Sequence, residues 1–148
     1  MSSMDGGYRE SGAEDRSILV VAFAGKVFGI APADGSVRWE HSVAYAGAVE
    51  LQIHGGRVFA STGASLHCLD YATGRLLGKV QVPDRYKGRP SMVIEGDRLY
   101  LGSQGEVTCF RLSDGAALWT QGLEGKGLGR VALGFPGNVR QADDAGTR

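Results

Sequence analysis

The densest group of potential binding side chains lies between two prolines near the middle of the chain. Pro83 and Pro90 enclose three basic residues and a tyrosine, namely Arg85, Tyr86, Lys87 and Arg89. Guanidinium, ammonium and phenol groups can hold a carboxylate, a phosphate or an acidic loop of a protein partner. A charged, solvated loop has the same composition, and the sequence leaves both interpretations open. We take these four residues as the candidate partner-binding site.

Cysteine and histidine are the other residues that could do chemistry. Cys68 and Cys109 form no Cys-x-x-Cys pair, which a zinc site of the usual spacing would need. We interpret the even spacing of His41, His54 and His67 as coincidence, because nothing in the sequence makes these side chains converge. No Gly-x-Ser-x-Gly motif is present. The sequence therefore predicts no catalytic residue, no metal site and no cofactor.

Composition argues against several classes of partner. The 148 residues include 16 basic and 16 acidic side chains, so no global field would attract nucleic acid or an anionic membrane. No segment approaches the roughly 20 apolar residues of a membrane span. Residues 1–16 are polar and lack the apolar stretch of a signal peptide. We expect a cytoplasmic protein with a disordered tail over 1–16 and a flexible tail over 140–148.

A glycine-centred pattern occurs three times along the chain. Its turn glycines are Gly35, Gly74 and Gly115, each preceded by a short apolar run. The period is about 40 residues, which is the length of one four-stranded propeller blade. Aspartate or threonine before each glycine, followed by a residue free to adopt a positive φ, is typical of a tight hairpin.

The runs between the turns are short and rich in β-branched and aromatic residues, which is typical of strands. They predict strands at 18–23, 26–31, 36–42, 50–54, 57–62, 65–70, 75–81, 91–95, 98–103, 106–111 and 116–121. No long window shows a helical period. The expected fold class is all-β, with antiparallel, propeller-type blades at about 18–42, 48–81 and 90–121 and a closing strand at 130–139. Together these segments form one repeat region over 17–139.

The aligned columns resemble the pyrroloquinoline-quinone-type (PQQ-like) β-propeller repeat. The first copy matches it at Gly25, Val27, Gly29, Ile30, Asp34, Gly35 and Trp39, and the third at Gly105, Val107, Cys109, Phe110, Asp114, Gly115 and Trp119. The resemblance implies a propeller whose repeat core includes Trp39, Trp119, Cys68, Cys109 and the turn glycines. In the second copy Gly78 replaces the tryptophan, which predicts altered docking of that blade and an open slot. The resemblance does not imply the quinone, because the acids, asparagine and adjacent cysteines of quinone-binding members have no match here.

The two ends of the repeat region do not match. The first copy lacks an innermost strand, whereas residues 130–139 repeat that strand and its turn beyond the third copy. Closure of three blades within one chain is too tight, because propellers typically hold four to eight. We expect a second copy, joined head to tail through strand 130–139, or a protein partner to complete the ring. A truncated gene product is the alternative.

Stiff blades with variable loops favour a non-catalytic protein–protein interaction or scaffold module. The alternative is a small-ligand or carbohydrate-binding propeller, in which each blade should reuse the same polar residues. Lys26, Ser65 and Glu106 share a column but no chemistry, which lowers that alternative. An enzyme of the quinoprotein or propeller-lyase kind ranks third, since no acid or histidine column is shared. We therefore expect a non-enzymatic interaction module that forms homo-oligomers.

Overall fold

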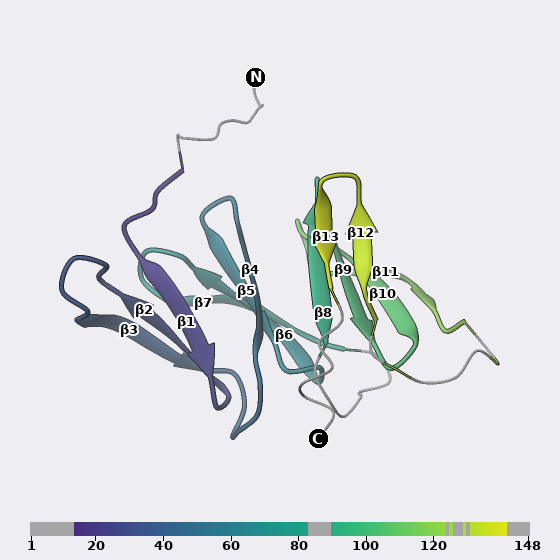
Figure 1. Cartoon of the computed structure of the whole chain (residues 1–148), viewed down its shortest axis with the longest axis horizontal. Coiled ribbons are helices and arrows are strands. Elements are labelled where there is room, and N and C mark those ends of the chain that lie inside the picture. Colours follow the sequence, from purple (N-terminus) through teal and green to yellow (C-terminus); the bar gives the residue numbers. More distant parts are fainter. Residues whose placement is uncertain (1–13, 83–89, 124, 126–128, 130, 142–148) are drawn as a thin grey trace.

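The computed structural model describes residues 14–82, 90–123, 125, 129 and 131–141. Every regular element in this part of the chain is a β-strand, and all strand pairs are antiparallel (Figure 1). The all-β fold that the sequence predicts is confirmed.

Three sheets and a hairpin follow one another along the chain, and each strand pairs with its sequence neighbours. The first sheet contains β1 (Leu19–Phe23), β2 (Lys26–Ile30) and β3 (Val37–Ser42). The second contains β4 (Glu50–His54), β5 (Arg57–Ser61), β6 (Ser65–Asp70) and β7 (Leu76–Gln81). The third contains β8 (Ser91–Glu95), β9 (Arg98–Ser103), β10 (Glu106–Arg111) and β11 (Ala117–Gln121), and the hairpin contains β12 (Leu133–Phe135) and β13 (Asn138–Arg140).

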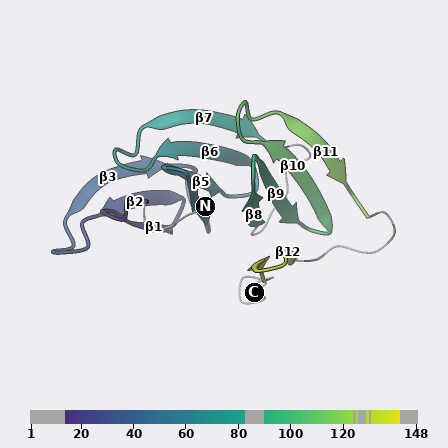
Figure 2. The ribbon, with the colours of Figure 1, turned by 90° about the horizontal axis from the view of Figure 1, so that it is seen from above.

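The three sheets stand side by side in an arc, as the blades of a propeller do (Figure 2). The last strand of each sheet, β3, β7 or β11, lies on the outside of the arc. The first strands and the β12–β13 hairpin lie toward the inside. This arrangement is a partial propeller, as expected from the repeat.

The turn before the outermost strand has the same geometry in all three sheets. Gly35, Gly74 and Gly115 have φ values of +77°, +74° and +74°. Each donates its backbone N–H to a carbonyl four residues earlier at 2.8 Å. A side chain is strained at such φ values, so the glycine of the repeat fixes the hairpin in every blade.

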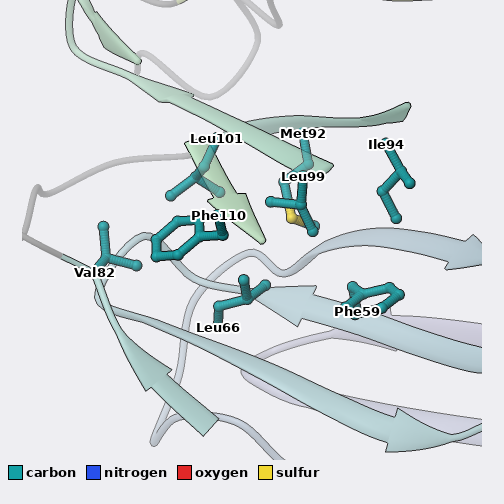
Figure 3. Close-up of a cluster of buried hydrophobic side chains, with 8 residues drawn as sticks. All are labelled: Phe59, Leu66, Val82, Met92, Ile94, Leu99, Leu101 and Phe110. Carbon is teal, nitrogen blue, oxygen red and sulfur yellow. The ribbon is translucent and has the colours of Figure 1, made fainter. Parts of the chain in front are cut away.

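The core consists of two apolar clusters between neighbouring sheets. The first and second sheets enclose Val27, Trp39, Val58, Ala60, Leu69 and Tyr71. The second and third sheets enclose Phe59, Leu66, Val82, Met92, Ile94, Leu99, Leu101 and Phe110, which point toward one another in Figure 3. Alternate residues of a strand face opposite sides of its sheet, so a blade in the middle buries both faces.

The segment expected to supply one closing strand contains two strands. Pro136 and Gly137 turn the chain between β12 and β13, and Gly137 has a φ of +74°. Leu133 pairs with Arg140, one residue inside the tail expected over 140–148. Because β12 and β13 pair with each other, the segment resembles the first two strands of a fourth blade.

Candidate functional site

The four residues of the predicted partner-binding loop, Arg85, Tyr86, Lys87 and Arg89, lie outside the described residues. Their role stays a prediction. The candidate surfaces that the structure does describe are the two ends of the blade arc and the contacts between blades.

The face of the first sheet that points away from the second sheet exposes repeat positions that are buried in the second and third sheets. Leu19 is 54% exposed, whereas the equivalent Val58 and Leu99 are both fully buried. Ile30 is half-buried, and its equivalents Leu69 and Phe110 lie in the core. The same column of the repeat is thus covered wherever a preceding blade is present.

We call this surface the open face and define it as Leu19, Val21, Phe23, Phe28 and Ile30. Pairing of β1 with β2 sets Leu19 opposite Ile30 and Val21 opposite Phe28, which places them on one side of the sheet. Phe23 is 60% exposed and stacks on Phe28, with ring centroids 5.4 Å apart. Contiguous apolar surface of this kind is a candidate interaction site.

The β12–β13 hairpin covers part of the opposite end. The Asn138 side-chain amide donates to the carbonyl of Ile94 at 2.7 Å, and the rings of Phe135 and Tyr100 lie 5.3 Å apart. Arg140 forms an ion pair with Glu50, whose side chain is 5% exposed. The hairpin is therefore held on the inside of the arc by both polar and apolar contacts.

Trp39 joins the first blade to the second. Its indole is 8% exposed, and its Nε1–H donates to the Tyr71 carbonyl at 3.0 Å. A methyl group added to Gly29 or to the turn residue Gly74 would collide with the indole. The ring thus fits between two glycines, one on its own blade and one on the next.

Trp119, the equivalent residue of the third blade, lies in a more open environment. It is 44% exposed, and its ring centroid is 6.0 Å from that of Tyr100. Cys109 stands opposite it in the β-ladder, where the first blade has Gly29. The equivalent of Gly74 would come from a further blade, so Trp119 belongs to the exposed surface of the arc.

The slot predicted at Gly78 is present. A Cβ added to Gly78 would meet no heavy atom within 4 Å. A cavity of about 400 Å³ lies here, and its lining includes Cys68, Gly78 and the turn residue Gly115. We call this cavity the inter-blade slot.

Neither cysteine is in a disulfide; Cys109 is buried and Cys68 is half-buried. The interpretation of the histidine spacing was incomplete, because two of the three residues meet. His41 Nε2 lies 2.8 Å from His67 Nδ1, with one ring from the first blade and one from the second. Burial, together with the nearby charges of His41 and Lys79, lowers the pKa of His67 to about 4.

The signal for this pair was the face that each histidine occupies, not the spacing between them. His41 lies two residues after Trp39 on β3, so the two side chains share one face of the strand. His67, on β6, occupies the repeat position of Phe28. Both histidines therefore face the interface between the first and second blades. Among the described residues, no group of three histidine, cysteine or acidic side chains could hold a metal ion. Nor does this part of the chain contain a helix with the length and apolar character needed to cross a membrane.

Comparison with known sequences assigns the repeat. The family described as "Outer membrane protein assembly factor BamB" matches residues 8–121. No curated protein matches the sequence significantly.

Solved structures share the fold at low sequence identity. BamB from Moraxella catarrhalis is 23% identical with a TM-score of 0.55, and the match covers 71% of this chain and 34% of that one. A europium-containing methanol dehydrogenase is 19% identical with a TM-score of 0.56, covering 70% and 23%. The computationally designed protein Ika8 is 18% identical with a TM-score of 0.66, covering 83% and 38%. The chain spans less than two-fifths of the length of each of these three structures.

Proposed function

We propose that this chain, which belongs to the family of the outer membrane protein assembly factor BamB, is a non-catalytic interaction module. The family consists of PQQ-type propeller repeats. Its blades provide a rigid support, and its partners bind at the exposed ends of the arc. The observation that carries this proposal is the open face, where Leu19 and Phe23 remain 54% and 60% exposed.

The partner that fits the open face best is another propeller blade. Within the chain, the equivalent face of the second blade packs against Val27 and Trp39 of the first in an apolar cluster. A second copy can repeat this packing by offering the end that carries Trp119 and the β12–β13 hairpin. Such a contact joins two different surfaces head to tail and closes into a ring if the rotation between the copies permits.

The geometry favours face-to-face packing over the addition of a single strand. Because β12 already pairs with β13, the segment would have to join β1 of another copy as a two-stranded hairpin, through the other edge of β12, and not as a single strand. Stacking of whole sheets keeps every existing ladder and still covers the apolar residues. The loop at Arg85, Tyr86, Lys87 and Arg89 stays a separate candidate for binding an acidic partner.

Light scattering on the 148-residue chain tests this proposal. We expect a mass of twice the 15.6 kDa of one chain, and a return to 15.6 kDa for Phe23→Asp, which buries a charge in the contact. Leu76→Asp changes an exposed leucine of β7 away from both ends and should leave the mass of the assembly unchanged. A wild-type mass of 15.6 kDa at every concentration, with no stoichiometric protein retained from a native lysate, would contradict the proposal.

A further inference from the structure

We propose that the free edge of β1 binds an extended segment of another protein, which joins the first sheet as a fourth strand. This segment carries a glutamine or asparagine between two apolar residues. Among the described residues the first sheet has three strands, whereas the second and third sheets have four each. The site is the backbone edge of β1 and not the open face, so the inference does not depend on the proposed assembly.

The free edge of β1 consists of the backbone groups of Val20 and Ala22. In an antiparallel ladder, the N–H and C=O groups of successive residues point to opposite edges of the strand. The groups of Ile18 point away from β2, because its N–H and its C=O both bond to the Tyr71 hydroxyl, at 2.8 Å and 2.6 Å. Val20 and Ala22 follow Ile18 in steps of two, so their groups point to this edge as well. In the described part of the chain, no strand other than β2 pairs with β1.

The Tyr71 hydroxyl takes the place of a neighbouring strand at one position of this edge. In the second blade the equivalent of Ile18 is Arg57, which pairs with His54 of β4. In the first blade the tyrosine, which reaches across from the second blade, bonds to Ile18 instead. One hydroxyl serves only one residue, so the next two edge positions of β1 remain available to a strand. Such an edge can bind an extended segment through main-chain hydrogen bonds.

The innermost strands of the second and third blades indicate which side chains the bound segment needs. Leu51 and Ile53 of β4 lie opposite the residues of β5 that are equivalent to two members of the open face. β8 has Met92 and Ile94 at the same positions, and both are buried. Side chains of directly opposite residues share one face of a sheet. Two apolar residues in the bound segment would therefore extend the apolar surface of the first blade.

The residue between these two apolar positions faces the next blade. Gln52 lies between Leu51 and Ile53, and its Nε2 donates to the carbonyl of Met92 at 3.1 Å. Leu51 is the residue of β4 that is equivalent to Met92. A glutamine in a segment bound to β1 would reach the Leu51 carbonyl in the same way. The preferred sequence is thus apolar–glutamine–apolar, as in β4 itself.

β12 of a second copy does not have this pattern. Counted back from its hairpin turn, the chain places Ala132 and Gly134 where β4 has Leu51 and Ile53. The larger Leu133 lies on the other face, within 3.5 Å of the position that a Cβ on Gly102 would take. An alanine and a glycine add little apolar surface beside β1. We therefore assign the edge to a segment of another protein.

Nuclear magnetic resonance titration of the full chain with acetyl-Glu-Leu-Gln-Ile-His-amide, the sequence of β4, tests the site. We expect a dissociation constant below about 1 mM, with the largest shift changes at the amides of Val20 and Ala22. N-methylation of the glutamine removes the N–H that would bond to the Val20 carbonyl, and it should weaken binding at least about tenfold. N-methylation of the leucine is the matched control, because this N–H points away from β1, and it should change the affinity less than about threefold. Equal effects of the two modifications, or no binding of the unmodified peptide, would overturn the assignment.

Variants of the chain test the place of binding. Ala22→Pro removes an N–H of the free edge and leaves the β1–β2 ladder intact, so it should weaken binding at least about tenfold. Ala22→Ser introduces the residue that β5 has at this position and should bind as the wild type does. Phe23→Asp changes the open face beyond the end of the peptide and should also bind as the wild type does, even where it abolishes assembly. Unchanged binding by an Ala22→Pro protein that is folded by circular dichroism, or lost binding in Phe23→Asp, would disprove the location. If Ala22→Pro does not fold, the N-methylated peptides decide the proposal alone.

Hydrogen exchange separates this occupant from the others. In a dilute solution of the chain, the amides of Val20 and Ala22 should exchange fast, and the peptide should slow them. Amides that are already protected at dilution would mean that another segment of this chain covers the edge, which would contradict the proposal. Peptide binding that competes with self-association would assign the edge to a second copy and would contradict it as well.

Discussion

At the scale of single residues, the two tryptophans of the repeat have different energetic roles. Trp39→Ala should lower the free energy of unfolding by about 3–5 kcal/mol, because it leaves a large cavity between two blades. It also leaves the Tyr71 carbonyl without its 3.0 Å indole partner. Trp119→Ala is the matched control and, at concentrations where the chain is monomeric, should cost about 1 kcal/mol or less, since this side chain is 44% exposed.

Urea denaturation of the two variants measures this difference. Equal losses of stability for the two substitutions would contradict the docking role that we assign to Trp39.

Burial of His67 beside His41 makes stability depend on pH. Folding lowers the pKa of His67 to about 4, while an unfolded histidine titrates near 6.5. Between these values the unfolded chain binds a proton that the folded chain does not, so the free energy of unfolding falls as the pH falls from about 6.5 to about 4. Below about 4 both states are protonated, and this contribution becomes constant.

Denaturation at a series of pH values in wild type and His67→Gln isolates the effect. The stability difference between the two proteins should change in favour of the variant as the pH falls from about 6.5 to about 4. A difference that stays constant over this interval would mean that His67 titrates normally in the folded protein.

Residue-level features could be predicted from the sequence where one copy of the repeat differs from the others at an aligned position. The substitution of Gly78 for tryptophan predicted an open slot, and the structure places a cavity of about 400 Å³ there. The contact of His41 with His67 was not predicted, because the two residues come from different blades. A separation of 26 positions matches no strand or turn period that would bring them together. Only the stacking of the blades brings them together.

At the scale of elements, the β12–β13 hairpin depends on a polar anchor. Arg140→Met should lower the free energy of unfolding by about 1–3 kcal/mol, because it leaves the buried Glu50 carboxylate without this cation. Adding Glu50→Gln should restore part of the loss, since the remaining group is neutral. A double-mutant cycle measures the coupling, and purely additive effects would show that the pair does not hold the hairpin.

Strand positions could be predicted closely because two-residue alternation and turn glycines are local signals. β9 and β10, for example, coincide with the predicted segments 98–103 and 106–111. The division of 130–139 into two strands was missed, since these residues were expected to supply one closing strand. Three-residue strands carry too few residues for a period to be recognised.

At the scale of the whole molecule, the account rests on an apolar sheet face that the described residues leave open. The second and third blades each bury this face against the blade before them, and the resulting clusters contain most of the core. Burial of apolar area is the main favourable term in association, so coverage of the first blade should stabilise an assembly by the same means. A single sequence reveals the repeat but not this exposure, because exposure depends on what packs alongside.

Hydrogen exchange at several protein concentrations tests this coverage most directly. The amides of β1 and β2, over Leu19–Phe23 and Lys26–Ile30, should exchange slowly at high concentration and faster on dilution, as the second copy dissociates. The amides of β9 and β10, already enclosed within one chain, should exchange at rates that do not change with concentration. Rates in β1 and β2 that are fast and independent of concentration would contradict the claim that another blade covers the open face.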